Sequence, residues 1–387
     1  MKKRLAIIST HPVQYNAPLF ARLSQSGALE IKVFYTYSQG SKEVFDRDFG
    51  KMISWDIPLL ENYSFEFIEN TAAKPGLDHF RGVVNPLLVN KISQFRPDAI
   101  LVYGWNYQGH LAVMRHFKGR VPVYFRGDST LNDEKRGMKA MMRRAFLKWI
   151  YKHADGAFFV GTNNKKYFLA HGLKEEELFF APHAIDITRF STNEGIRKQA
   201  EARRAELGIS KEEMVVLFAG KFEPKKDPIT LVNAFIQLDR PGGRLLLVGN
   251  GILEKELRVL AGNDSRILFL PFQNQSLMPS LYAMADVFVL PSKGPGETWG
   301  LAVNEAMAAG KAVLVSDKAG CAADLVRSGR NGYVFEAGNL SDLGEKLRIM
   351  LSSPESLQKM GYVSREMMSS WSYDEICKSI ERQIGRV

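Results

Sequence analysis

The stretch from Leu290 to Gly310, LPSKGPGETWGLAVNEAMAAG, holds the strongest structural signal in the sequence. An apolar run ends at Leu290, a loop rich in glycine and proline follows, and a helix is predicted from near Thr298 to Gly310. The first turn of a helix presents backbone N–H groups and the positive end of the helix dipole. This order of elements therefore predicts an anion site that a phosphate group fits.

Two glutamates in this stretch, Glu297 and Glu305, are eight positions apart. On a helix, this spacing corresponds to an axial separation of about 12 Å. Such a separation argues against an acid–base pair and favours contacts with hydroxyl groups at opposite ends of a long ligand, such as a nucleotide sugar. The alternative is that Glu297 is a first-turn carboxylate favoured by the helix dipole and that Glu305 is solvated.

Short apolar runs alternate with helical stretches along the whole chain. The runs lie at 5–9, 31–37, 99–103, 121–125 and 157–160 in the first half, and at 215–219, 245–248, 267–270, 287–290, 312–315 and 333–335 in the second. Because they are continuously apolar, they predict parallel strands that helices cover on both faces.

The polar stretch 191–210 separates the two series of strands. We expect two doubly wound domains, 1–190 and 191–370, and a final helix in 371–387 that packs back on the first domain. Ligands of such sheets bind beyond the carboxyl ends of the strands, so the loops that follow the strands are the candidate functional segments.

Composition excludes several classes of protein. With 45% hydrophobic and 24% charged residues among 387, the chain has the composition of a globular protein. No apolar run approaches the 18 residues of a spanning helix, and the apolar part of the N-terminus is too short for a signal peptide. The two cysteines show no metal or disulfide spacing, so we expect a cytoplasmic protein without a metal.

A formal net charge of +10 predicts attraction to an anionic partner. No nucleic-acid-binding motif is present, so nucleic acid is not the expected partner. The basic and apolar stretch 138–152 predicts either a helix on an anionic membrane surface or an amphipathic helix that covers the first sheet.

The phrase ETWGLAVNEAMAAG at 297–310 resembles the retaining nucleotide-sugar glycosyltransferases of family 4, whose hallmark is two glutamates separated by seven residues. The resemblance implies the GT-B fold, two facing Rossmann-like domains with a deep interdomain cleft. It also implies that Glu297 contacts the donor sugar and Glu305 the ribose. The backbone segment implied to approach the phosphates comprises Thr298, Trp299, Gly300 and Leu301, with Trp299 in place of the usual Phe.

A second feature of the resemblance is GKFEPKK at 220–226. The family has Gly-Arg here and a Lys about five residues further on, both directed at the donor diphosphate. Gly220 precedes Lys221, which stands in the position of the Arg, and Lys226 stands in the position of the Lys. Lysine lacks the bidentate fork of arginine but keeps its charge. A solvated basic turn is the alternative.

Two further turns of the second domain are weaker candidates. Gly249 and Gly251 form a Gly-x-Gly turn after a strand, and Phe272 and Gln273 follow the next one. The resemblance places the first turn near the nucleotide and the second at the base. A tight turn and a buried aromatic residue are the alternatives.

The first domain departs from the family pattern. Where relatives carry a glycine-rich loop, the chain has His11 and Gln14, candidates for phosphate or acceptor binding. Arg126 and Asp128 stand near the position of a family histidine beside the donor sugar, and Trp105 is a candidate sugar platform. The alternatives are a surface histidine, a turn held by a local ion pair or Asx cap, and core packing for the tryptophan.

The resemblance implies retaining transfer of a sugar from a UDP- or GDP-linked donor to an acceptor hydroxyl, with no metal and no cofactor beyond the donor itself. The expected acceptor is a glycan, a lipid-linked saccharide or a protein, at the inner face of the cell membrane. A nucleotide-sugar epimerase of the same fold and a non-catalytic nucleotide-sugar-binding protein remain alternatives. A dehydrogenase is weaker, because no Gly-x-Gly-x-x-Gly follows the first strand.

Overall fold

The computed structural model describes residues 2–38, 44–46, 51–53, 55–134, 137–238 and 242–387. The chain divides into two compact units. The first comprises Met1–Val44, Ile57–His183 and Tyr373–Val387, and the second comprises Phe45–Asp56 and Ala184–Ser372. The division after His183 comes earlier than the predicted boundary at 190. Phe45–Asp56 also groups with the second unit, where the Asp56 carboxylate accepts a hydrogen bond from the Ser276 N–H at 3.1 Å.

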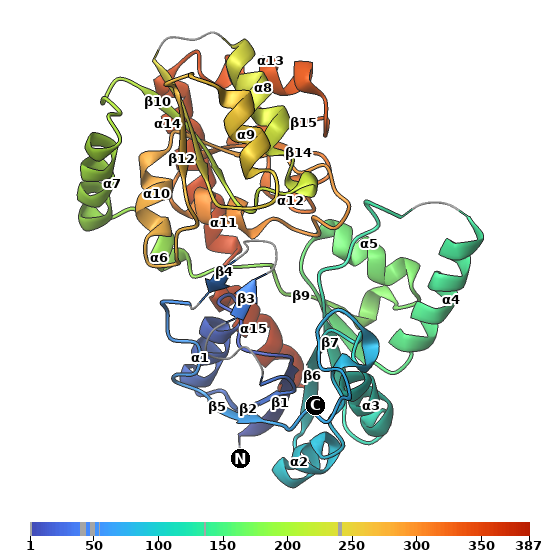
Figure 1. Ribbon diagram of the computed structural model, residues 1–387. Coiled ribbons are helices and arrows are strands. Elements are labelled where there is room, and N and C mark those ends of the chain that lie inside the picture. Colours follow the sequence, from blue (N-terminus) through green and yellow to red (C-terminus); the bar gives the residue numbers. More distant parts are fainter. Residues whose placement is uncertain (1, 39–43, 47–50, 54, 135–136, 239–241) are drawn as a thin grey trace. The chain divides into compact units, whose positions relative to one another are not determined.

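The first unit contains a seven-stranded parallel sheet with the order β5-β2-β1-β6-β7-β8-β9 (Figure 1). Its strands are β1 (Lys3–Ser9), β2 (Leu29–Tyr35), β5 (Ser64–Phe67), β6 (Ala99–Tyr103), β7 (Val123–Arg126), β8 (Gly156–Phe159) and β9 (Leu178–Phe180). The central strands are buried on both faces: all four residues of 5–8 and of 99–102 are inaccessible to solvent. This is the pattern that continuous apolar runs predict.

Helices cover both faces of this sheet. They are α1 (Ala17–Gln25), α2 (Leu88–Phe95), α3 (Gln108–Phe117), α4 (Met138–Tyr151), α5 (Thr162–Ala170) and α15 (Tyr373–Ile384), with the short 3-10 turns η1 (Phe80–Gly82) and η2 (Glu175–Glu177). Helix α15 joins the first unit although it ends the sequence. Its Asp374 pairs with Arg22 of α1 at 2.7 Å, and the Tyr373 hydroxyl donates to the Tyr15 carbonyl at 2.9 Å.

The second unit contains a six-stranded sheet with the order β12-β11-β10-β13-β14-β15, again parallel throughout. The strands are β10 (Met214–Ala219), β11 (Gly243–Val248), β12 (Ile267–Leu270), β13 (Val287–Leu290), β14 (Ala312–Ser316) and β15 (Gly332–Phe335). A separate two-stranded sheet joins β3 (Val44–Asp46) and β4 (Lys51–Ile53).

The helices of the second unit pack on both faces of its sheet. They are α6 (Ile187–Phe190), α7 (Glu194–Glu206), α8 (Pro228–Gln237), α9 (Glu254–Ala261), α10 (Met278–Met284), α11 (Leu301–Ala308), α12 (Ala322–Leu325), α13 (Leu340–Met350) and α14 (Pro354–Met367), with the 3-10 turns η3 (Pro224–Lys226) and η4 (Met368–Ser370). Among the described residues, no helix is long and apolar enough to span a membrane.

The expectation of two doubly wound, Rossmann-like parallel sheets is confirmed. The strands that the sequence did not predict include β5 and β9, which lie at the two edges of the first sheet. Edge strands are covered less completely, so β5 reads Ser-Phe-Glu-Phe and lacks a continuous apolar run. The expected cleft between the domains stays a prediction.

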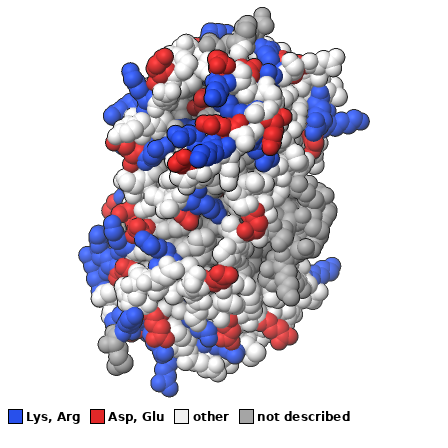
Figure 2. Space-filling model, turned by 90° about the vertical axis from the view of Figure 1, so that its left-hand side faces the viewer, with Lys and Arg blue, Asp and Glu red and all other residues white. Residues whose placement is uncertain are grey.

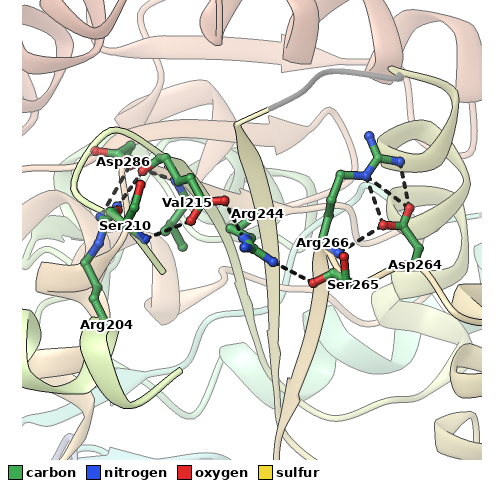
Figure 3. A network of polar contacts seen from close by, with 9 residues as sticks. Arg204, Ser210, Val215, Arg244, Asp264, Ser265, Arg266 and Asp286 are labelled. Atoms are coloured by element: carbon green, nitrogen blue, oxygen red, sulfur yellow. Dashed lines mark hydrogen bonds and ion pairs between the residues drawn. The ribbon is translucent and has the colours of Figure 1, made fainter. Parts of the chain in front are cut away.

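Several arginines of the second unit are committed to its structure rather than to a ligand. Figure 3 shows them near the amino ends of β10 to β13, opposite the edge where ligands of such sheets bind. Arg244 donates to the Ser265 carbonyl at 2.6 Å, Arg266 pairs with Asp264 at 2.6 Å, and Arg204 donates to the Ser210 carbonyl at 2.8 Å. Positive and negative side chains are also interspersed on the face shown in Figure 2. These arginines are therefore engaged within the unit and do not mark a ligand site.

Candidate functional site

Two loops of the second unit meet at the carboxyl edge of its sheet. One follows β10 and the other follows β13, and these strands are parallel neighbours, so both loops leave the same edge. The Lys293 N–H donates to the Lys225 carbonyl at 2.9 Å, which ties the loops together through their backbones. Most of the strongest sequence candidates lie in these two segments.

Lys226 and Glu297 meet where the loops join. The Lys226 Nζ lies 2.5 Å from the Glu297 Oε2, and the Ser292 hydroxyl donates to the same oxygen at 2.9 Å. The carboxylate is buried, with 8% of its side chain exposed, whereas the lysine keeps 20% exposure. One ammonium and one hydroxyl thus hold the carboxylate in place, while the lysine still reaches solvent.

Asp227 and Lys293 add a second ion pair beside the first. The Lys293 Nζ lies 3.0 Å from the Asp227 Oδ1, and the Thr230 hydroxyl donates to the Asp227 Oδ2 at 2.8 Å. Asp227 adopts φ +49°, a left-handed conformation that is uncommon for a residue other than glycine. Sequence reasoning missed both residues. The signals were available: an Asp-Pro pair at a helix start, and a lysine in the glycine- and proline-rich loop before Glu297.

The segment that precedes α11 is pressed against the loop after β14. The Glu297 carbonyl accepts from the Gly320 N–H at 3.1 Å, and a Cβ on Gly320 would lie 1.7 Å from the Thr298 carbonyl oxygen. Gly300 has φ +104°, and a Cβ there would lie 2.6 Å from the Leu290 side chain. The helix begins at Leu301 rather than near Thr298, because Gly300 in the left-handed region interrupts the helical geometry. Glu297 is therefore not a first-turn carboxylate.

Trp299 and Glu305 lie inside the second unit. The Trp299 indole N–H donates to the Asn304 side chain at 2.8 Å, and its ring packs against Trp371 at 5.3 Å between centroids. The Trp299 side chain is thus part of the packing, which leaves its backbone as the group that can approach a ligand. Glu305 is 3% exposed and accepts from the Tyr282 hydroxyl at 2.7 Å, so it is not a solvated helix residue.

The two glycines after β11 pack directly against the segment that carries Lys221. Gly249 has φ +147° and Gly251 φ +157°. A Cβ on Gly249 would lie 2.0 Å from the Gly220 carbonyl oxygen, and one on Gly251 would lie 2.4 Å from that of Phe222. Any side chain would push the two turns apart. These glycines therefore position the Lys221 turn, whether or not they contact a nucleotide themselves.

Phe272 and Gln273 follow β12 at the same edge. The Phe272 N–H donates to the Asn250 side chain at 2.9 Å, and its ring lies 6.3 Å from that of Trp55. The Gln273 side chain accepts from Arg203 of α7 at 2.9 Å. Both residues are anchored by neighbours that the sequence did not identify.

In the first unit, Arg126 is turned inward instead of facing an open surface. Its guanidinium is buried and donates to the carbonyls of Ala181 and Pro182 at 2.8 and 2.9 Å. Burial lowers the pKa of this arginine. The group ties β7 to the segment after β9, and its role beside a donor sugar stays a prediction. Asp128 lies 3.8 Å from the His183 Nε2 and keeps 46% of its side chain exposed.

The remaining candidates of the first unit make mostly local contacts. The His11 Nδ1 lies 3.0 Å from the Thr10 hydroxyl, and burial lowers the pKa of its ring, which favours the neutral imidazole over a phosphate-binding cation. Gln14 lies in the turn that precedes α1. The Trp105 ring packs edge-on against Phe146 at 5.7 Å and covers part of the core. Core packing is thus an observed role for this tryptophan.

Across the described ranges, no group of three or more His, Cys, Asp or Glu residues is placed to hold a metal ion. The cation that contacts Glu297 is the Lys226 side chain. The expected independence from metal and cofactor stays a prediction.

Comparison with known proteins finds relatives of the second unit. Residues 199–367 match the family model "Glycosyl transferases group 1", which covers the loops of the second unit described above. The chain is 31% identical over 217 residues to D-inositol 3-phosphate glycosyltransferase of Nocardia farcinica, covering 52% of this chain and 46% of that protein. It is 26% identical over 304 residues to sulfoquinovosyl transferase SQD2 of Arabidopsis thaliana, covering 75% and 57%. The chain thus spans about half the length of the curated relatives it matches.

The fold extends over the whole chain. The crystal structure of Anabaena Alr3699/HepE in complex with UDP and glucose matches with a TM-score of 0.73 at 20% identity and covers 100% of both chains. WaaG, a glycosyltransferase involved in lipopolysaccharide biosynthesis, matches with a TM-score of 0.67 at 15% identity and covers 98% of this chain and 99% of its own. These likenesses establish the fold, and the predicted GT-B fold is confirmed.

Proposed function

We propose that the protein is a retaining glycosyltransferase of family 4, which moves a sugar from a UDP- or GDP-linked donor to an acceptor hydroxyl. The observation that carries the proposal is the contact between Lys226 and Glu297, two residues from the loops after neighbouring strands. The family match over 199–367 supports it, and so does the likeness to HepE, whose structure was solved with UDP and glucose.

The lysines act on the leaving group. As the acceptor oxygen bonds to the anomeric carbon, the bond from that carbon to the diphosphate breaks and negative charge builds on the diphosphate. The Lys226 ammonium has three N–H donors, so it can hold Glu297 and a diphosphate oxygen at once. Lys221 and the positive end of α11 supply further stabilisation at the same edge, the electrostatic contribution that usually dominates such catalysis.

The glutamates hold the donor. Glu297 is already fixed by Lys226 and Ser292, and it positions the sugar hydroxyls for attack on the face that the leaving group vacates. Glu305 binds the ribose, and the backbone from Thr298 to Leu301 approaches the phosphates. Because lysines and a helix dipole neutralise the diphosphate, the reaction requires no metal.

Acceptor binding falls to the first unit, whose loops depart from the family pattern. Residues 9–16, 104–107 and 126–129 follow β1, β6 and β7 at the carboxyl edge of its sheet. The acceptor is a glycan, a lipid-linked saccharide or a protein, and the reaction takes place in the cytoplasm at the inner face of the membrane.

Thermal unfolding with nucleotides tests the donor site. A ligand that binds only the folded protein raises the melting midpoint, so UDP or GDP should raise it and ADP and NAD should not. Lys226→Ala should abolish the shift. Lys225→Ala is the matched control, because this neighbouring lysine pairs with Glu223 at 3.4 Å and not with Glu297. A shift by NAD alone, or an undiminished UDP or GDP shift in Lys226→Ala, would overturn the assignment.

Product analysis then separates transfer from its alternatives. With the matching nucleotide sugar, transfer consumes donor only when an acceptor is present and conserves the anomeric configuration. An epimerase would convert the donor without an acceptor, and a binding protein would leave the donor unchanged.

A further inference from the structure

Helix α4 carries two apolar faces, and only one of them is covered by the protein. Leu147, Ile150 and Tyr151 are buried against the first sheet. At 100° per residue, they lie together on one side of the helix. The opposite side carries a second apolar series with the spacing i, i+3, i+4, i+7, i+8 and i+11. We call this series the outer face; its members are Met138, Met141, Met142, Ala145, Phe146 and Trp149.

The outer face is open to solvent. The exposed fractions of Met138, Met141 and Met142 are 79%, 72% and 68%. The protein itself therefore covers little of these three side chains. Phe146 and Trp149 stack at 5.8 Å between centroids with an angle of 26°, and both remain exposed. Helix α4 lies at the outer edge of the first unit in Figure 1. A contiguous exposed apolar stripe of this kind marks an interaction surface.

Basic side chains border the outer face along both sides. On the helical wheel, Lys139 and Arg143 flank it on one side and Arg144 and Lys148 on the other, with Lys152 at its C-terminal end. No Asp or Glu occurs between 138 and 152. Glu134, which precedes the helix, pairs with Arg144. Four of the five cations thus remain on the borders without an ion pair to Glu134.

We propose that α4 docks the first unit on a lipid bilayer that contains anionic phospholipids, with the outer face inserted between the headgroups. An apolar stripe with aromatic residues, bordered by Lys and Arg, is the composition of helices that lie in the plane of a membrane surface. Long cationic side chains extend from such a helix to the phosphates, while methionine adapts to irregular apolar surroundings.

A second copy of the chain fits this face less well. A symmetric contact through the outer face would bring two sets of five cations together with no acidic residue of 138–152 between them, and like charges at close range repel. The charge pattern therefore favours an anionic partner. The surface also stands apart from the proposed transferase activity, because none of its residues belongs to the second-unit loops.

Flotation of the full chain with vesicles tests the proposal. Vesicles of phosphatidylcholine mixed with phosphatidylglycerol should carry the protein, vesicles of phosphatidylcholine alone should carry much less, and added salt should weaken the binding. The double variant Met141→Gln, Met142→Gln should lower the lipid-bound fraction by about tenfold. Glutamine keeps the helix propensity, and both positions are exposed, so we expect the variant to fold normally.

Two controls distinguish vesicle binding through the outer face from nonspecific binding by other exposed apolar or basic residues. The double variant Val259→Gln, Tyr362→Gln removes two exposed apolar residues of the second unit, at 75% and 64% exposure, and should bind vesicles as the wild type does. Lys139→Gln with Lys148→Gln should weaken binding to the anionic vesicles, whereas Lys198→Gln with Lys378→Gln should weaken it less.

Three results would overturn the proposal. They are no flotation with either kind of vesicle, equal flotation of wild type and Met141→Gln, Met142→Gln, and a lipid-free oligomer in light scattering that this variant converts to monomer. The last result would assign the outer face to contacts between copies. The nucleotide-induced melting shift of the same samples reports the donor site separately, so the failure of one proposal leaves the other standing.

Discussion

The loops of the second unit and those of the first unit hold their polar side chains in different ways. In the second unit, Lys226 pairs with Glu297 and Lys293 with Asp227, so each pair joins two loops across the edge of the sheet. In the first unit, the Arg126 guanidinium donates hydrogen bonds to two backbone carbonyls, and His11 contacts its neighbour Thr10. In the second unit, charged side chains pair across two loops. In the first unit, these polar side chains bond to backbone carbonyls or to a neighbouring residue.

This difference indicates that the preformed site lies in the loops of the second unit. Side chains held by partners from another loop keep their geometry without a ligand, which is the preorganisation that binding a diphosphate sugar requires. The first-unit loops carry fewer such constraints, so they can vary in sequence while the fold persists. We therefore expect substitutions in the second unit to affect transfer broadly and those in the first unit to affect stability or acceptor choice.

The largest effect is expected from Lys226→Ala. Removal of one preorganised cation from the leaving group should lower kcat by about a hundredfold or more, since a single donor of this kind contributes about 3 kcal/mol to the transition state. Steady-state kinetics with saturating donor measures it, and Lys225→Ala should retain near wild-type kcat. Equal kcat values for the two variants would show that the contact between Lys226 and Glu297 has no role in transfer.

Gly249→Ala should destabilise the second unit by about 3 kcal/mol and weaken nucleotide binding with it. The new Cβ would meet the Gly220 carbonyl oxygen at 2.0 Å, so the turn that carries Lys221 must move. Chemical denaturation and the UDP melting shift together measure the effect. Gly338→Ala is the matched control: it also has positive φ, with no atom within 4 Å of its Cβ, and should cost about 1 kcal/mol.

Arg126→Met should cost about 2 to 3 kcal/mol of stability and leave nucleotide affinity unchanged. The substitution leaves two buried carbonyls without their donors, and the affected contacts belong to the first unit. Denaturation and nucleotide titration test both parts. Asp128→Asn, at a half-exposed carboxylate, should change stability by less than about 0.5 kcal/mol. If Arg126→Met were fully stable but failed to use acceptor, the arginine would have a ligand role after all.

The smallest expected effect is a pH dependence that originates in the first unit. His110 is fully buried and bonded to Thr36 and the Gly104 carbonyl, and burial lowers its pKa to about 4. The unfolded chain titrates near 6.5, so it binds more protons than the folded protein between these values. Stability should therefore fall with falling pH, by about 2 kcal/mol between pH 7 and pH 5.

Denaturation of His110→Gln over the same pH range measures this contribution, with the exposed His116→Gln on the same helix as the control. The slope should flatten in the first variant and persist in the second. An unchanged slope in His110→Gln would assign the pH dependence to other groups.

Most of the fold could be predicted because buried parallel strands need continuous apolar runs, and these are visible in the sequence. The runs 99–103 and 287–290 match β6 and β13 residue for residue. Edge strands such as β5 escaped prediction because they are only half covered and alternate polar with apolar residues. Of the site, the two glutamates and Lys226 were identified by motif, whereas Asp227, Ser292 and Lys293 were not, because they matter through contacts and not through a pattern.

The sequence alone determined the two doubly wound units, the glycine turns and the outer periodicity of α4, since each depends on residue types at local spacing. Tertiary structure decided which of these residues meet. Lys226 and Glu297 are 71 positions apart, and they touch because β10 and β13 are neighbours in the sheet. It also decided that α4 buries Leu147 and Ile150 and turns its methionines to solvent. Both outcomes depend on long-range packing, where the apolar area buried against distant residues outweighs any preference that the local sequence expresses.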